Sequence, residues 1–146
     1  NPFTPAVNLY FALEASLTMM QKEGLNNIFT RHARHKKATQ EGIKAMGLKL
    51  FTKENFGSPA ITAVKPENID AENIRQVIKN DFDILLAGGQ DHLKGKIFRI
   101  GHLGFVNDRD IISVISALES TLDKIGKLNV PIGNGLAKTI SILNNE

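Results

Sequence analysis

The amino-acid sequence predicts one α+β domain, with a small mixed or antiparallel sheet and helices on one face of it. The length of 146 residues is that of a single domain able to bury a core. Segments with helical apolar spacing dominate the two ends of the chain, and short β-branched or alternating segments lie between them. Helices grouped in this way favour this arrangement of layers.

The first two elements are predicted to be helices. Apolar residues at three- and four-residue spacing predict a single apolar face, formed by Val7, Tyr10, Leu13, Leu17 and Met20. Gly24 ends this helix as a C-cap glycine, and a second helix follows over residues 25–46. The middle of the second helix, residues 31–37, is basic and polar, so we expect deep packing only at its two ends.

Short strands are predicted in the middle of the chain. The segments that carry strand-like residues are 48–51, 60–64, 82–86 and 96–100. A helix over residues 68–79, with Asp70 as its N-cap, separates the second strand from the third. Residues 88–90 are predicted to form a loop because two glycines occur there.

Two more helices are predicted at the end of the chain. Asn107 or Asp108 caps the longer one, whose apolar residues step by four and three from Ile111 to Ile125. The last helix spans residues 133–143.

Composition narrows the classes of function. The chain has no cysteine, which excludes disulfides, thiolate nucleophiles and cysteine-ligated metal centres, and fits a cytoplasmic protein. Its net charge of +3 does not by itself indicate a nucleic-acid partner. No apolar run is long enough for a membrane span. We therefore expect neither nucleic acid nor a membrane as a partner.

Two histidines in the second helix are weak candidates for a metal site. His32 and His35 are three residues apart, but no carboxylate or thiolate accompanies them, and we predict no metal site. The basic segment 31–37 around them could follow the phosphates of a nucleic acid. A solvated helix face is the commoner structure for such a charge run.

Arg99 is the most informative single residue, because it interrupts the apolar strand 96–100. By alternation it faces outward; if it is buried, it needs an anion partner, since an unpaired buried guanidinium is costly. A carboxylate suits that partner role through a fork of two hydrogen bonds. The pattern alone favours the two interpretations equally.

The motifs along the chain, taken in order, resemble class V aminotransferases that depend on pyridoxal phosphate. The matching segments are Thr4–Val7, Tyr10–Leu17, Glu23–Leu25, Arg31–His32, Gly42, Met46–Phe51 and Phe98–Gly104. The resemblance is nearest to alanine–glyoxylate and serine–glyoxylate aminotransferases, and similar cyanobacterial proteins carry the name soluble hydrogenase small subunit. Each motif alone is weak, whereas the ordered set covers nearly the whole chain.

This resemblance implies a fold and a domain arrangement. It implies the small C-terminal domain of fold-type I aminotransferases, a three- to four-stranded, mainly antiparallel sheet covered by helices. Residues 1–24 would be an N-terminal loop and linking helix, and residues 25–146 the small domain. The large domain, with the lysine that binds the cofactor, would lie upstream, so no catalytic residue is expected in this chain.

The resemblance also assigns two site residues. Arg99 matches the family arginine that grips the α-carboxylate of the substrate. Thr4 matches the segment that reaches the cofactor phosphate of the neighbouring subunit, which implies a homodimer. The threonine hydroxyl is able to donate to a phosphate oxygen.

The function implied is that of a parent enzyme that moves an amino group from serine or alanine to a 2-oxo acid such as glyoxylate, with this chain inactive alone. An alternative is a non-catalytic accessory or partner-binding module, in line with the hydrogenase-subunit name. The absence of cysteine argues against hydrogen chemistry in the chain itself. Nucleic-acid binding through residues 31–37 is a third interpretation, and its affinity would fall steeply with salt.

Overall fold

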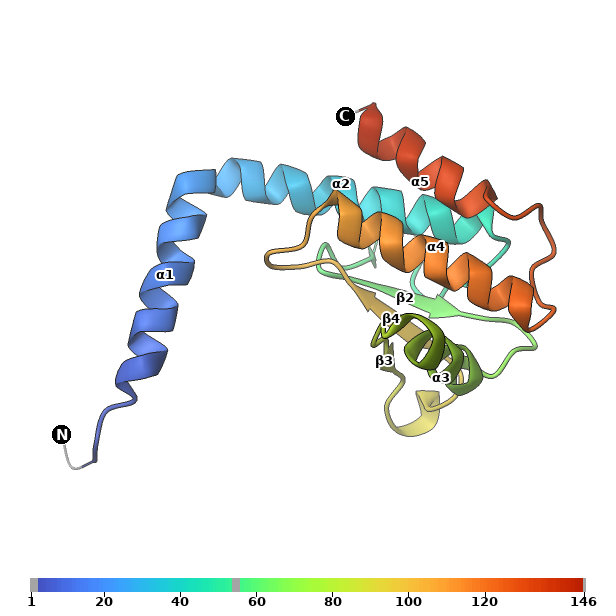
Figure 1. The fold of residues 1–146 in the computed structure, drawn as a ribbon, viewed down its shortest axis with the longest axis horizontal. Coiled ribbons are helices and arrows are strands. Elements are labelled where there is room, and N and C mark those ends of the chain that lie inside the picture. Colours follow the sequence, from blue (N-terminus) through green and yellow to red (C-terminus); the bar gives the residue numbers. More distant parts are fainter. Residues whose placement is uncertain (1–2, 54–55, 146) are drawn as a thin grey trace. The chain divides into compact units, whose positions relative to one another are not determined.

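The computed structural model describes residues 3–53 and 56–145, and the chain divides after Arg31 into two compact units. The first unit holds α1 (Val7–Glu23) and the first residues of α2 (Leu25–Ala45). The second unit holds the rest of α2 and all the elements that follow it along the chain (Figure 1). The candidate site described below lies in the second unit.

A four-stranded antiparallel sheet organises the second unit. Its strands are β1 (Lys49–Leu50), β2 (Ile61–Lys65), β3 (Ala87–Gly88) and β4 (Phe98–Gly101). Their order across the sheet is β1-β2-β4-β3, so β2 and β4 are central and β3 is an edge strand. The register places Thr62 opposite Ile100, and Arg99 between Ala63 and Ala87. The predicted α+β class and the antiparallel sheet are confirmed.

Within the second unit, the described helices pack on one face of this sheet (Figure 1). They are the later part of α2, α3 (Ala71–Phe82), α4 (Asp108–Lys124) and α5 (Asn134–Asn144), of which α4 packs against both α3 and α5 (Figure 1). The buried strand residues Val64, Phe98 and Ile100 share one core cluster with apolar residues of all four helices. The opposite face carries Ala63, Ala87 and Arg99, none of which is fully buried.

Local capping explains where the helices begin and end. Asp70 caps α3 by accepting a hydrogen bond from the Glu72 amide at 2.9 Å, as predicted. Asn107 caps α4, and Asp110 completes a capping box by accepting from the Asn107 amide at 2.8 Å. Gly24 ends α1 with a positive φ of 84°, as the sequence predicted for a glycine at this position.

The third predicted strand is wrong in position. Residues 82–86 do not form a strand, because α3 continues to Phe82 and ends at Asp83 in the left-handed region. The strand forms instead at Ala87 and Gly88, where a loop was predicted. The apolar run 82–86 is explained by the burial of Leu86 against the core as the chain leaves α3.

Two predictions for the first helices are also corrected. The middle of α2 is packed rather than solvated, because His35, Ala38 and Thr39 are fully buried. The predicted apolar residues of α1 share a side, but the helix is not apolar on that side alone, because Leu9 and Phe11 lie away from it, and α1 has no buried residue. An apolar helix of this kind is typical of a segment that other protein surrounds.

The packing of α2 against α5 generates a stability prediction. A Cβ atom on Gly42 would lie 2.2 Å from the Thr139 hydroxyl and 3.2 Å from the Gly135 carbonyl oxygen. We expect Gly42→Ala to lower the free energy of unfolding by about 1–3 kcal/mol, measured by urea denaturation of the protein that contains this chain. Gly101→Ala is the matched control, since nothing lies within 4 Å of a Cβ there. Equal stability of the two variants would contradict this account of α2–α5 packing.

Candidate functional site

Arg99 lies on a central strand and faces the side of the sheet that is not covered by the described helices of the second unit. It is half-buried, and its neighbours in β4, Phe98 and Ile100, point into the core. The residues directly opposite it, Ala63 and Ala87, have only methyl side chains. These small neighbours leave space around the guanidinium on a rigid strand. The outward orientation, one of the two interpretations that the pattern left open, is therefore present.

The guanidinium of Arg99 is held at one nitrogen. Nε donates a hydrogen bond to the Gly88 carbonyl oxygen at 3.0 Å. Within residues 3–53 and 56–145, this is the one hydrogen bond of the Arg99 side chain. The two terminal nitrogens therefore keep their N–H groups for a partner outside the described residues. A carboxylate fits two such nitrogens through a pair of parallel hydrogen bonds.

The carbonyl that holds Arg99 belongs to the edge strand, which a second arginine ties to α3. Arg75 Nε donates to the Leu86 carbonyl oxygen at 2.7 Å, and its guanidinium also pairs with Glu72 one turn earlier. Sequence analysis missed Arg75. The available signal was the three-residue spacing of Glu72 and Arg75, but such pairs are common on helix surfaces and give no hint of a nearby strand.

The two histidines of the basic segment have separate partners. His35 Nε2 lies 2.8 Å from the Asp108 carboxylate, which Arg34 also contacts at 2.7 Å. His32 Nε2 lies 3.5 Å from the Gly104 carbonyl oxygen. In the part of the chain that the structure describes, no three His, Cys, Asp or Glu residues gather as a metal site would require. The basic segment thus contributes to the contact between α2 and α4.

His102 follows β4 directly and is fully buried. Its Nε2 lies 2.9 Å from the Thr62 hydroxyl. Burial lowers the pKa of His102 to about 4, the positive charges of His35 and His32 act in the same direction, and backbone hydrogen bonds oppose the change. The imidazole is therefore neutral at physiological pH and acts as a structural hydrogen-bonding group between β2 and β4.

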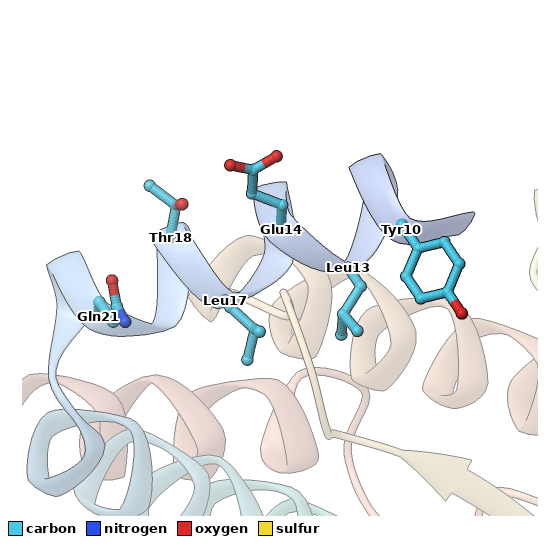
Figure 2. A pocket seen from close by; sticks show the side chains of 6 residues that line it. All are labelled: Tyr10, Leu13, Glu14, Leu17, Thr18 and Gln21. Carbon is cyan, nitrogen blue, oxygen red and sulfur yellow. The ribbon is translucent and has the colours of Figure 1, made fainter. Parts of the chain in front are cut away.

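The first unit contributes one hollow and one candidate residue. The hollow lies along α1, where Tyr10, Leu13 and Leu17 point to one edge of the helix and Glu14 and Thr18 point to the opposite edge, with Gln21 as the sixth lining residue (Figure 2). It is a stripe on one helix, with no titratable pair or buried polar group. Thr4 lies just before α1 and is exposed. Among the described residues, no helix is both long and apolar enough to cross a membrane.

Comparison with known proteins shows which fold the chain shares. No family profile matches the chain. The soluble hydrogenase small subunit of a Synechococcus species is 56% identical over 142 residues, which is 97% of this chain and 37% of that protein. The serine–glyoxylate aminotransferase of Arabidopsis thaliana is 38% identical and matches 99% of this chain, but only 36% of the enzyme.

The similarity to a solved structure extends over nearly the whole chain. The ureidoglycine–glyoxylate aminotransferase of Bacillus subtilis superimposes with a TM-score of 0.92 at 32% identity, covering 98% of this chain and 37% of that protein. Over nearly its whole length the chain is therefore similar to the C-terminal domain of class V aminotransferases, in sequence and in fold. The chain spans little more than a third of the length of the relatives it matches.

The buried His102 gives the domain a pH-dependent stability. Its folded-state pKa of about 4 lies below the usual 6.5, so the unfolded chain binds the proton more readily. The contribution of neutral His102 to the free energy of unfolding is therefore complete above pH 6.5 and is lost as the pH falls toward 4. This loss is on the order of 3 kcal/mol. We expect His102→Gln to flatten the fall in unfolding free energy between pH 7 and 4. The exposed His92 supplies the control, because His92→Gln should keep the wild-type slope.

Proposed function

We propose that the protein containing this domain is a pyridoxal-phosphate-dependent aminotransferase. It moves an amino group from a small amino acid, such as serine or alanine, to a 2-oxo acid such as glyoxylate. The relatives named above support this reaction class. The observation that carries the proposal is the Arg99 guanidinium, fixed at Nε by Gly88 and, among the described residues, without a hydrogen-bond partner at its two terminal nitrogens.

Arg99 binds the carboxylate of both substrates in this proposal. An amino acid and a 2-oxo acid each carry a carboxylate bonded directly to the carbon that reacts. A single arginine can therefore orient donor and acceptor in the same way as they bind in turn. Since Nε is occupied, the two terminal nitrogens form the fork and set the direction from which the carboxylate approaches.

The residues described here do not form a cofactor pocket. Bound pyridoxal phosphate supplies an electron sink for the carbon that loses its proton. The one candidate contact is Thr4, whose exposed hydroxyl can donate a single hydrogen bond to a phosphate oxygen. One exposed hydroxyl does not hold such a group. We therefore assign the remaining cofactor contacts and the reactive lysine to the rest of the protein, and expect residues 1–146 alone to be inactive.

The exposed apolar helix fits a domain that functions against other protein. Leu9 is 71% exposed and Phe11 is 65% exposed, which is unusual for large apolar side chains in a helix. We assign residues 1–24 as a linking segment and residues 25–146 as the small domain of a cytoplasmic homodimer. In this arrangement the large domain and the neighbouring subunit cover α1, and Thr4 reaches the neighbour's cofactor phosphate.

A second candidate function rests on the name of one relative. The Synechococcus protein, at 56% identity, is called a soluble hydrogenase small subunit, which suggests a partner-binding module without transamination. The chain has no cysteine, so it offers no thiolate ligand for a hydrogenase metal centre. The domain would then act as a docking surface only.

One measurement separates the two functions. The full-length protein, loaded with pyridoxal phosphate, is mixed with alanine in the absence of a 2-oxo acid. The aminotransferase proposal expects one pyruvate released per active site, together with loss of the visible absorption band of the bound cofactor. Residues 1–146 alone should release none. A full-length protein that binds the cofactor and yields no pyruvate from alanine, and no oxo acid from serine, would contradict transamination.

The carboxylate role of Arg99 gives a second prediction. Loss of one charged, partly desolvated contact costs about 2–5 kcal/mol, so Arg99→Gln should raise the KM for alanine by roughly two orders of magnitude. The absorption of bound cofactor should stay unchanged, because Arg99 does not contact it in this proposal. Steady-state kinetics of the full-length enzyme measure the first effect and spectroscopy the second.

A matched control for Arg99 is Arg109, an exposed arginine at the start of α4 whose side chain bonds only to Asn107 among the described residues. Arg109→Gln should leave KM within about twofold of the wild type, as surface changes of this kind have small effects. Wild-type KM in Arg99→Gln would remove the carboxylate role.

A further inference from the structure

Arg75 is connected to Arg99 by a short path of backbone. It donates from Nε to the Leu86 carbonyl oxygen at 2.7 Å, and two residues later the Gly88 carbonyl oxygen accepts from Arg99 Nε at 3.0 Å. Both carbonyl groups belong to the segment that forms the edge strand. Arg75 of α3 and Arg99 of β4 therefore donate hydrogen bonds to the same short stretch of main chain, residues 86–88.

The edge strand needs such a tether because it has little support of its own. β3 has only two residues and pairs with a single neighbour, β4. One further backbone bond, from the Gly89 amide to the Ile97 carbonyl oxygen at 3.1 Å, continues the ladder. By contrast, α3 is firmly placed, since Ala71, Ile74 and Ile78 are fully buried. Arg75 thus joins a weakly held strand to a well-anchored helix.

The glycine at position 88 fits this role of Arg75. A Cβ atom there would lie 2.7 Å from Arg75 Nη1 and 2.9 Å from Glu72 Oε1, closer than side chains allow. Gly88 does not have a positive φ, so the backbone conformation does not require glycine. The missing side chain instead leaves room for the paired Arg75 and Glu72 beside the strand.

We propose that Arg75 is a positioning residue for the substrate carboxylate. By holding the Leu86 carbonyl, and with Glu72 fixing its own guanidinium, it sets the place of the Gly88 carbonyl. That carbonyl keeps Arg99 Nε engaged, so that the two terminal nitrogens alone meet the carboxylate. The inference rests on the proposed function, because it assigns to Arg75 the geometry of the same site.

The test uses the full-length protein and a carboxylate that cannot react. Lactate has a carboxylate next to a substituted carbon but no amino group, and its Kd is measured by calorimetry. Arg75→Met removes the hydrogen-bond donors while keeping a long side chain, and loss of one hydrogen bond of this kind should weaken lactate binding about fivefold. The KM for alanine should rise by the same factor, whereas kcat should stay within about twofold of the wild type.

A double variant distinguishes positioning from a general loss of structure. If Arg75 acts through Arg99, Arg75→Met should have almost no further effect on lactate binding in a protein that already carries Arg99→Gln. A merely structural role would weaken binding equally in both backgrounds. Arg75→Lys keeps the charge beside Glu72, so its lactate affinity should lie between those of the wild type and Arg75→Met. If Arg75→Met does not fold, Arg75→Lys is used in its place.

The outcomes separate this inference from the proposed function. Two results would overturn the role of Arg75 and leave the carboxylate role of Arg99 intact. One is an unchanged lactate affinity and an unchanged KM in Arg75→Met or Arg75→Lys. The other is a loss of lactate affinity in Arg75→Met that adds fully to the loss caused by Arg99→Gln. If Arg99→Gln itself leaves lactate binding and KM unchanged, this result contradicts the carboxylate role of Arg99, and the proposed role of Arg75 is then excluded as well. Arg109→Gln serves as the neutral control in every measurement.

Discussion

The register of β4 between β2 and β3 is the constraint on which both the core and the candidate site depend. Because β4 is paired on both edges, its side chains must alternate strictly between the two faces of the sheet. Phe98 and Ile100 complete the core, and Arg99 is placed on the open face. A slip of one residue would bury the guanidinium and expose Phe98. The apolar packing of the domain therefore fixes the position of the arginine.

The open face of the sheet gives the domain its asymmetry. An antiparallel sheet is stable with helices on one side only, so nothing in the fold itself requires the second side to be covered. Several large apolar side chains nevertheless lie outside the core, among them Leu85 at 76% and Phe105 at 83% exposure. Exposed apolar groups of this kind, together with Arg99 on the open face of the sheet, suit contact with a further domain, as the proposed function requires.

The sequence was most informative where the chemistry is local. Asp70, Asn107 and Gly24 act within a few residues of themselves, and the helix ends they predict are those observed. The prediction for residues 82–86 failed because periodicity alone cannot assign a short apolar run to a strand. Phe82 is the last residue of α3, and of the residues that follow it only Leu86 is buried. His35 was expected to be solvated because its partner, Asp108, is 73 residues away. No local pattern reports such a contact.

The candidate site shows the same division between local and distant information. Alternation placed Arg99 on the outer face, but its hydrogen bond to Gly88 depends on a strand whose position was not foreseen. The tie from Arg75 depends in turn on how α3 packs. These contacts make the site more than one exposed cation, because a side chain fixed at Nε loses less freedom when it binds a carboxylate. In the proposed function the domain orients the substrate through one arginine on a strand that is paired on both of its edges.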